Sequence, residues 1–191
     1  MILSRLSSQL SLTGAARFES DHVEPGPSLS TLVLLHYLKH DESTALTNVG
    51  HLKHTDVSNL TFLLVEQWGL QFLNPQSQQW EFLEPRPGHA IVNVGDFLRF
   101  KSGGELASIV HRVIPLREKQ DEDRYSIAYF FRMNDDTRFT DPTGKSWTAK
   151  EWHDFKFDVF RSPSTLDSQG QFLTGMMEKN DRMVAREGIT Q

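Results

Sequence analysis

The sequence contains no cysteine, which excludes disulfide scaffolds, thiolate metal sites and cysteine nucleophiles. Any metal must therefore be bound by His, Asp or Glu. Apolar runs such as Leu32–Leu35 are far shorter than the ~20 residues that cross a bilayer. Long runs of Lys and Arg are missing too, and a net charge of -5 lacks the basic footprint of a nucleic-acid binder. We therefore expect neither a membrane nor a nucleic acid as partner.

The composition is that of an ordinary globular protein. With 38% hydrophobic and 24% charged residues, the 191 residues suffice for one domain with its own core. The first segment is Ser-rich and carries Arg5 and Arg17, which faintly resembles a transit peptide. An amphipathic helix with Leu3, Leu6 and Leu10 on one face is the favoured interpretation, and the cytoplasm is the expected location.

Short β-rich segments follow one another without intervening helices. Turn-rich pieces containing Pro and Gly separate them, and this spacing predicts an antiparallel sandwich or barrel. The segments are Thr31–Tyr37, Asn59–Val65, Ala90–Val94, Ser108–Ile114 and Arg124–Phe131. We therefore predict one domain over residues 1–191 that is mainly β with flanking helices and has its β core at about 28–135.

The last third of the chain indicates helices. Thr148 is followed three residues later by Glu151, which is the spacing of a capping box, so a helix is expected to begin there. Residues Ser162–Gly170 have a loop-like composition, and Leu173–Arg186 are expected to form a terminal helix. The C-terminal part, at about 148–191, is thus expected to be helical.

His54 and Asp56 form a His-x-Asp pattern. In an extended strand, residues two apart point to the same face, so the two side chains would converge. A mononuclear iron(II) oxygenase needs two imidazoles and one carboxylate on one face of the metal, and this pattern supplies two of the three. The pattern is short enough to arise by chance. On pattern alone, His111 in the apolar segment ASIVHRVIP fits a third ligand or a buried structural histidine.

Arg124 and Ser126 form a second pair on one face of an expected strand. A guanidinium matches a carboxylate with two parallel hydrogen bonds and stays charged, while a serine hydroxyl adds a further donor. The pair is therefore suited to gripping a carboxylate. The alternative is a surface Arg124 paired with Asp121, Glu122 or Asp123, in a solvated interaction worth little.

With these residues in place, the sequence resembles the iron(II)- and 2-oxoglutarate-dependent dioxygenases of the isopenicillin N synthase-like superfamily, in particular its fungal members. The similarity covers about residues 28–135 and runs from the His-x-Asp motif through PRPGH, NVGD and IVHRVIP to RYSIAYFF. The segment TAKEWHDFKFDVFR also resembles the C-terminal helix of the fungal members. The resemblance implies a double-stranded β-helix core of the jelly-roll, cupin-like kind.

The resemblance also implies roles for individual residues. The expected iron ligands are His54, Asp56 and His111. The expected contacts of the 2-oxoglutarate carboxylate are Arg124, Ser126 and Tyr37. A core tyrosine is an equal alternative for Tyr37, because Leu38 follows it where the family usually has Pro. Asn93–Asp96 match a family turn, and we interpret its Gly and Asp as turn residues.

The function implied by the resemblance is that of an oxidoreductase. It would use Fe(2+), 2-oxoglutarate and dioxygen to hydroxylate or desaturate a small organic molecule in secondary metabolism. Some family members use the Arg-x-Ser pair for a substrate carboxylate instead of 2-oxoglutarate. A zinc hydrolase with the same three ligands is less favoured, because it gives Arg124 and Ser126 no role.

The chain departs from the family at its start. Members carry a strand-rich region upstream that completes the double-stranded β-helix, so the core is expected to be incomplete on that side, with sheet edges and apolar surface exposed. The alternatives are a truncated paralogue, an incomplete gene model and one half of an assembly. The rival function is a non-catalytic chain that binds metal or ligand and acts with a second chain completing the fold.

Overall fold

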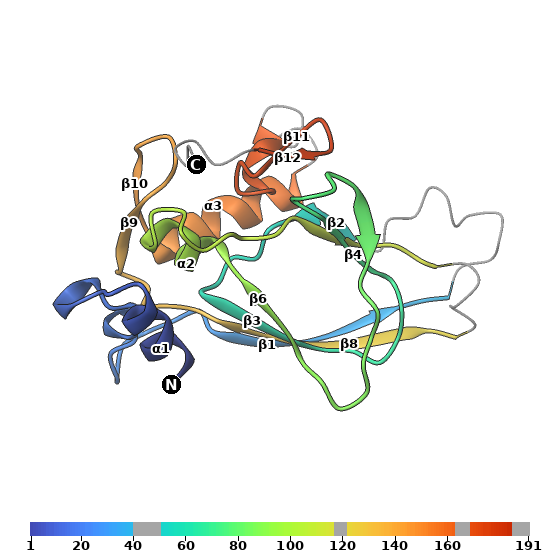
Figure 1. The fold of residues 1–191 in the computed structure, drawn as a ribbon, viewed down its shortest axis with the longest axis horizontal. Helices are drawn as coiled ribbons and strands as arrows, with labels where there is room; N and C mark the ends of the chain where they lie inside the picture. Colours follow the sequence, from blue (N-terminus) through green and yellow to red (C-terminus); the bar gives the residue numbers. More distant parts are fainter. Residues whose placement is uncertain (40–50, 117–121, 163–168, 185–191) are drawn as a thin grey trace.

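Figure 1 shows the computed structural model of the chain, which describes residues 1–39, 51–116, 122–162 and 169–184. Within these residues, two four-stranded antiparallel sheets are accompanied by three α-helices. The strand order is β1-β8-β3-β6 in the major sheet and β2-β7-β4-β5 in the minor sheet. The expected mainly β fold with flanking helices is confirmed, and the two antiparallel sheets form its jelly-roll core.

The elements have the following bounds. The major sheet contains β1 (Thr31–Tyr37), β8 (Arg124–Phe131), β3 (Leu60–Leu64) and β6 (Ile91–Val94). The minor sheet contains β2 (His51–His54), β7 (His111–Val113), β4 (Leu70–Leu73) and β5 (Trp80–Phe82). Two hairpins pair β9 (Arg138–Thr140) with β10 (Ser146–Thr148) and β11 (Glu178–Lys179) with β12 (Arg182–Met183). The α-helices are α1 (Ile2–Gln9), α2 (Asp96–Lys101) and α3 (Ala149–Arg161). Short 3-10 turns are η1 (Gly14–Ala16), η2 (Phe18–Asp21) and η3 (Gly170–Phe172).

Strands β1 and β8 form one side of the major sheet, with β1 at its edge. They pair in register over the full length of β1. Side chains of β1 alternate between the two faces, so Val33, Leu35 and Tyr37 line a cavity between the sheets. Leu32 and Leu34 point to the opposite face, where Leu34 is 74% exposed. The inner face of the major sheet therefore faces the cavity, whereas its outer face carries exposed apolar side chains.

The first helix, α1, lies near α2 at the same end of the sheets (Figure 1). It buries Leu3 and packs Leu6 and Leu10 into a cluster with Phe18 and Leu98. An apolar face that meets a core in this way stabilises a short helix more than its intrinsic propensity does. The expected amphipathic helix is thus confirmed.

Helix α3 begins at the expected capping box. The Glu151 N–H donates to Thr148 Oγ1 at 3.1 Å, and the Glu151 side chain accepts from the Thr148 N–H at 2.7 Å. One turn further, Trp152 is fully buried and packs edge-on against Phe100 and Trp147. This aromatic cluster fixes α3 against α2 and the β9–β10 hairpin.

Two expectations about the course of the chain are wrong. The segment expected as a helix over Leu173–Arg186 instead forms the β11–β12 hairpin, although residues 185–191 lie outside the described part. The hairpin turn residues Asn180 and Asp181 have positive φ angles of 55° and 56°, as a type I′ turn requires. Strands β4 and β5 also lie in a segment that the sequence indicated as turn-rich. Among the described helices, none is long and apolar enough to span a membrane.

Candidate metal centre

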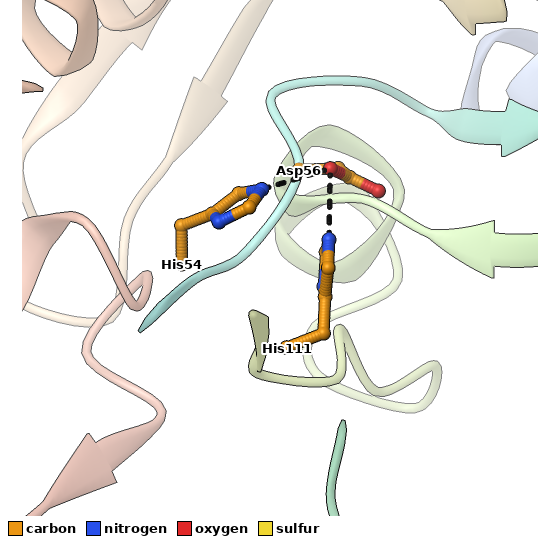
Figure 2. Close-up of side chains that lie close together, drawn as sticks. All are labelled: His54, Asp56 and His111. Carbon is orange, nitrogen blue, oxygen red and sulfur yellow. Dashed lines mark ion pairs between the residues drawn. The ribbon is translucent and has the colours of Figure 1, made fainter. Parts of the chain in front are cut away.

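Three metal-ligating side chains meet where β2 ends and β7 begins. His54 ends β2, Asp56 lies two residues later, and His111 begins β7 directly opposite His54. Figure 2 shows both imidazoles pointing toward Asp56, with their Nε2 atoms 3.6 Å (His54) and 3.4 Å (His111) from Asp56 Oδ1. One ligand atom from each residue lies within 4.8 Å of the other two. The structure therefore brings together all three residues that the sequence predicted as metal ligands.

The convergence of His54 and Asp56 has a different origin from the expected one. Strand β2 ends at His54, so the two side chains do not share the face of one strand. Thr55 instead leaves the sheet, because its N–H donates to the carbonyl of Leu173 at 2.9 Å and its hydroxyl donates to Asp96 at 2.7 Å. A turn anchored on Thr55 thus aims Asp56 at the two imidazoles.

Backbone carbonyls orient both imidazoles. His54 Nδ1 lies 2.7 Å from the carbonyl oxygen of Leu52, and His111 Nδ1 lies 3.0 Å from that of Ile109. A carbonyl can only accept, so Nδ1 carries the proton in each ring and leaves Nε2 free to bind a metal. Each histidine therefore presents its lone pair to the same point.

Asn93 orients the carboxylate from the opposite side. This residue lies on β6, and its Nδ2 donates to Asp56 Oδ2 at 2.7 Å. One carboxylate oxygen is thereby occupied, and the other, Oδ1, faces the imidazoles. The sequence had indicated Asn93 only as part of a turn motif, so this contact was missed.

The electrostatics of the centre suit a bound cation. Burial opposes the charge of Asp56, but in the metal-free chain the two imidazoles, when Nε2 also carries a proton, hold the pKa of this carboxyl well below its usual range, chiefly through the charge of His111. Burial and the charge of His111 lower the pKa of His54. Burial also opposes protonation of His111, yet the charge of Asp56 raises its pKa. An ionised carboxylate between two imidazoles is the donor set of a divalent metal site.

A buried ion pair holds Thr55, the residue between the candidate ligands His54 and Asp56. Lys156 on α3 and Asp96 at the start of α2 are 3% and 0% exposed, and Lys156 Nζ lies 2.6 Å from Asp96 Oδ2. Nζ also donates to the carbonyl oxygen and the hydroxyl of Thr55, both at 2.8 Å. The interpretation of Asp96 as a turn residue is thus corrected, because its side chain is a buried partner of a lysine that lies 60 residues away.

Arg124 lines the cavity with two guanidinium nitrogens that have no hydrogen-bond partner among the described residues. The side chain is almost fully buried, and its Nε donates to the carbonyl of Trp68 at 3.0 Å. Its Nη1 and Nη2 atoms are buried and have no hydrogen-bond partner within the described part of the chain. Ser126 lies on the same face of β8, and Tyr37, which is opposite Arg124 on β1, has its ring 5.0 Å from the guanidinium carbon. Burial raises the pKa of the Tyr37 hydroxyl, which therefore keeps its proton.

The acidic residues before Arg124 do not neutralise it among the residues that the structure describes. Glu122 accepts a hydrogen bond from Gln67 at 3.0 Å, and Asp123 accepts from His36 at 2.7 Å. Asp121 lies outside the described residues. The expectation of a buried carboxylate-binding arginine thus agrees with the geometry better than the surface ion pair does.

One cavity of about 410 Å³ joins the two groups of residues. The three candidate ligands, Arg124, Ser126 and Tyr37 all line it, and most of the remaining wall is apolar. A concave, mainly apolar pocket with a few convergent polar groups is typical of a small-molecule site. The arrangement can hold a metal at one place and a carboxylate at another.

Known proteins share this sequence pattern. The model of the 2OG-Fe(II) oxygenase superfamily matches residues 29–133. The 2-oxoglutarate-dependent dioxygenase iboH of Amanita muscaria is 49% identical over 181 residues, which cover 93% of this chain and 86% of that protein. The oxidoreductase vrtI of Penicillium aethiopicum is 49% identical over 183 residues, which cover 95% of this chain and 44% of that protein.

A solved structure shares the fold. A full-length protein of Neurospora crassa, solved in complex with alpha-KG, has a TM-score of 0.64 and 26% identity over 84% of this chain and 51% of that chain. The chain therefore spans about half the length of the Neurospora crassa protein and somewhat less of vrtI. Residues 29–133, which the family model matches, contain the two sheets that carry the candidate site.

Proposed function

The chain belongs to the 2OG-Fe(II) oxygenase superfamily, and from this premise we propose that it is an iron(II)- and 2-oxoglutarate-dependent dioxygenase that hydroxylates or desaturates a small organic molecule. The proposed iron ligands are His54, Asp56 and His111. The proposed contacts of the distal carboxylate of 2-oxoglutarate are Arg124, Ser126 and Tyr37. The observation that carries the proposal is the buried, unpaired guanidinium of Arg124 in the same cavity as the three candidate ligands.

The donor set fits iron(II). Two imidazole nitrogens and one carboxylate oxygen on one face of an octahedral ion leave the other positions for the cosubstrate and dioxygen. When bound, iron(II) with 2-oxoglutarate and dioxygen supplies an oxidant for an unactivated C–H bond, and 2-oxoglutarate leaves as succinate and carbon dioxide. The apolar cavity wall excludes water from this chemistry. A zinc hydrolase would use the same ligands and leave Arg124 without a function.

The unpaired Arg124 guanidinium requires an anion. Leaving the terminal N–H groups of a buried cation without acceptors is costly, and a carboxylate accepts from both in parallel. The Ser126 and Tyr37 hydroxyls can donate to the same carboxylate. A bifunctional oxo-acid therefore fits the cavity, with one end at Arg124 and the other at the metal.

An anaerobic titration with iron(II) and 2-oxoglutarate tests the proposal. We expect one iron and one 2-oxoglutarate per chain, together with the weak visible metal-to-ligand charge-transfer band of a chelated oxo-acid. Arg124→Gln should weaken 2-oxoglutarate binding at least ~10-fold and retain iron binding, since a buried charged contact is lost. Arg112→Gln is the matched control, because Arg112 bonds Gln71 and lies over Trp80, outside the cavity.

The metal assignment is tested separately. His111→Ala should abolish stoichiometric iron binding, whereas His89→Ala, at an exposed turn, should not. Unchanged iron content in His111→Ala would refute the third ligand. With oxygen supplied, the isolated chain should convert 2-oxoglutarate to succinate. Iron uptake without any conversion would instead support the rival role of a non-catalytic chain that acts with a partner.

A further inference from the structure

Iron(II) and 2-oxoglutarate, in their proposed positions, leave almost no charged side chain of the described cavity wall free for a substrate. Lys156 lines the cavity, but its three N–H groups donate to the Asp96 carboxylate and to two oxygens of Thr55. A lysine ammonium has three donors, so none remains. Its charge is balanced by a fully buried carboxylate.

Arg132 is the other cation of the wall. Its Nε donates to the carbonyl of Val57 at 2.6 Å, and its Nη1 donates to the carbonyl of Leu29 and to Thr31 Oγ1. The guanidinium carbon also lies 5.0 Å from the centre of the Phe130 ring. This arginine therefore holds the segment after Asp56 through Nε and Nη1, while its Nη2 has no partner and its charge no carboxylate within ion-pair distance among the described residues.

Two neutral polar side chains of the cavity wall already form hydrogen bonds within the protein. The Thr61 hydroxyl hydrogen-bonds Ser58 at 2.9 Å, and Asn93 donates to Asp56. His51 differs from them, since its ring nitrogens make no hydrogen bond within the described residues. A substrate thus meets one imidazole without a hydrogen-bond partner among the described residues and a largely apolar wall.

His51 and Phe160 form an aromatic pair beside the metal centre. His51 begins β2, Phe160 lies on α3, and their rings stack with centroids 5.2 Å apart at 30°. The His51 ring also meets His54 edge-on, with centroids 4.6 Å apart. Because both rings line the cavity, a group that packs against this pair lies next to the proposed iron.

From this arrangement, and on the premise of the proposed function, we infer that the substrate carries no positive charge and contains a flat ring, which packs against the His51–Phe160 pair and accepts or donates one hydrogen bond at His51. A cationic substrate group would lose its hydration with no free carboxylate to receive it, since Asp56, the carboxylate of the described cavity wall, is assigned to iron. A flat ring gains stacking contacts beyond the area that it buries. The pair is thus a substrate-binding element distinct from the carboxylate site at Arg124.

The test uses the anaerobic complex of the chain with iron(II) and saturating 2-oxoglutarate, so that Arg124 is occupied. The probes are 2-naphthol, 2-naphthoate, 2-naphthylmethylammonium and decahydro-2-naphthol. Dissociation constants come from calorimetry and from the shift of the charge-transfer band. We expect 2-naphthol and 2-naphthoate each to bind at least ~10-fold more tightly than 2-naphthylmethylammonium, and 2-naphthol to bind about threefold or more tighter than the decahydro analogue.

Variants locate the binding element. His51→Ala and Phe160→Ala should each weaken 2-naphthol about threefold to tenfold and keep the charge-transfer band, while His51→Phe should retain most of the affinity because it keeps a ring. His36→Ala is the matched control, since His36 stacks on Tyr125 on the outer face of the major sheet. The band reports in every variant that the fold and the metal centre are intact.

Different outcomes would refute the proposed function and the inferred substrate class. A missing band in the unmodified chain would refute the proposed function. A normal band with equal or tighter binding of 2-naphthylmethylammonium, or with equal binding of decahydro-2-naphthol, would overturn the inferred substrate class. Unchanged 2-naphthol affinity in both His51→Ala and Phe160→Ala would overturn the location.

Discussion

Lys156→Met removes one half of the buried ion pair, and we expect it to lower the free energy of unfolding by about 3–5 kcal/mol. Asp96 is fully buried and would lose the ammonium that lies 2.6 Å from its Oδ2. Its remaining donors, Thr55 Oγ1 at 2.7 Å and Trp152 Nε1 at 3.2 Å, supply hydrogen bonds without a counter-charge. Asp96→Asn leaves the Lys156 ammonium in the same position and should cost a similar amount.

The double variant distinguishes a paired charge from two independent contacts. Lys156→Met with Asp96→Asn removes both charges, so its cost should fall short of the sum of the single costs by about 2–3 kcal/mol. The measurement is urea unfolding of the metal-free chain, followed by tryptophan fluorescence. Costs that add to within about 0.5 kcal/mol would refute the coupling. Because Lys156 also holds Thr55 between two ligands, the single variant should weaken iron(II) binding about tenfold or more.

Three further perturbations test other contacts. Asn93→Ala removes the donor to Asp56 Oδ2 and should weaken iron(II) binding about 10- to 100-fold, measured by competition with a chelator. Gly175 has a φ of 56°, and an added Cβ would lie 2.6 Å from an Asp96 oxygen. Gly144 also has a positive φ, of 89°, but the space around it is open. Gly175→Ala should therefore lower the free energy of unfolding about 1–3 kcal/mol more than Gly144→Ala does. Burial lowers the pKa of His22 from 6.5 to about 4, so the unfolded chain binds the proton more readily than the folded chain does. The free energy of unfolding is therefore highest above pH 6.5 and falls as the pH drops toward 4, by about 1–2 kcal/mol at pH 5. His22→Phe should remove this part of the pH dependence, measured by urea unfolding at several pH values.

Each of these has a clear contrary result. An iron affinity unchanged by Asn93→Ala would mean that the carboxylate needs no such support. Equal losses at the two glycines would remove the steric part of the argument and leave only backbone strain. Parallel stability curves for His22→Phe and the unmodified chain, between pH 7 and pH 4, would show that this histidine is not buried in its neutral form.

The longest strands could be predicted from the sequence to the residue. Thr31–Tyr37 and Arg124–Phe131 are rich in β-branched and aromatic residues and are bounded by turn-forming segments. Their apolar character on both faces comes from a cavity on one side and an exposed outer face on the other. A run of this kind carries a strand signal whichever face is buried.

Shorter elements depend on contacts that a local pattern does not contain. Strand β4 pairs with both β5 and β7, while Gly69 and Pro75, which flank β4, indicate turns. The expected helix from Leu173 fails because Gly175 and Asn180 take positive φ angles. The Asn-Asp turn of the β11–β12 hairpin was the signal that could have been used.

The candidate site, too, could be predicted from the sequence only in part. The six site residues predicted from the sequence all line one cavity. Four of them could be found because the His-x-Asp and Arg-x-Ser motifs carry their chemistry within three residues. Asn93 and Lys156 carry no such mark. Their partners lie 37 residues away for Asn93 and 101 residues away for the Thr55 contact of Lys156, so only the folded chain identifies them.

The contact between Lys156 and Thr55 ties the metal centre to the attachment of α3. If α3 separates from the sheets, Thr55 loses its anchor and the turn that aims Asp56 is released. With iron bound as proposed, metal loss and this local opening become one linked equilibrium, and saturation to about 100 times the dissociation constant protects the chain by about 2.7 kcal/mol. A cell short of iron would then hold a larger open fraction of the protein, exposed to proteases, so its abundance would follow the iron supply.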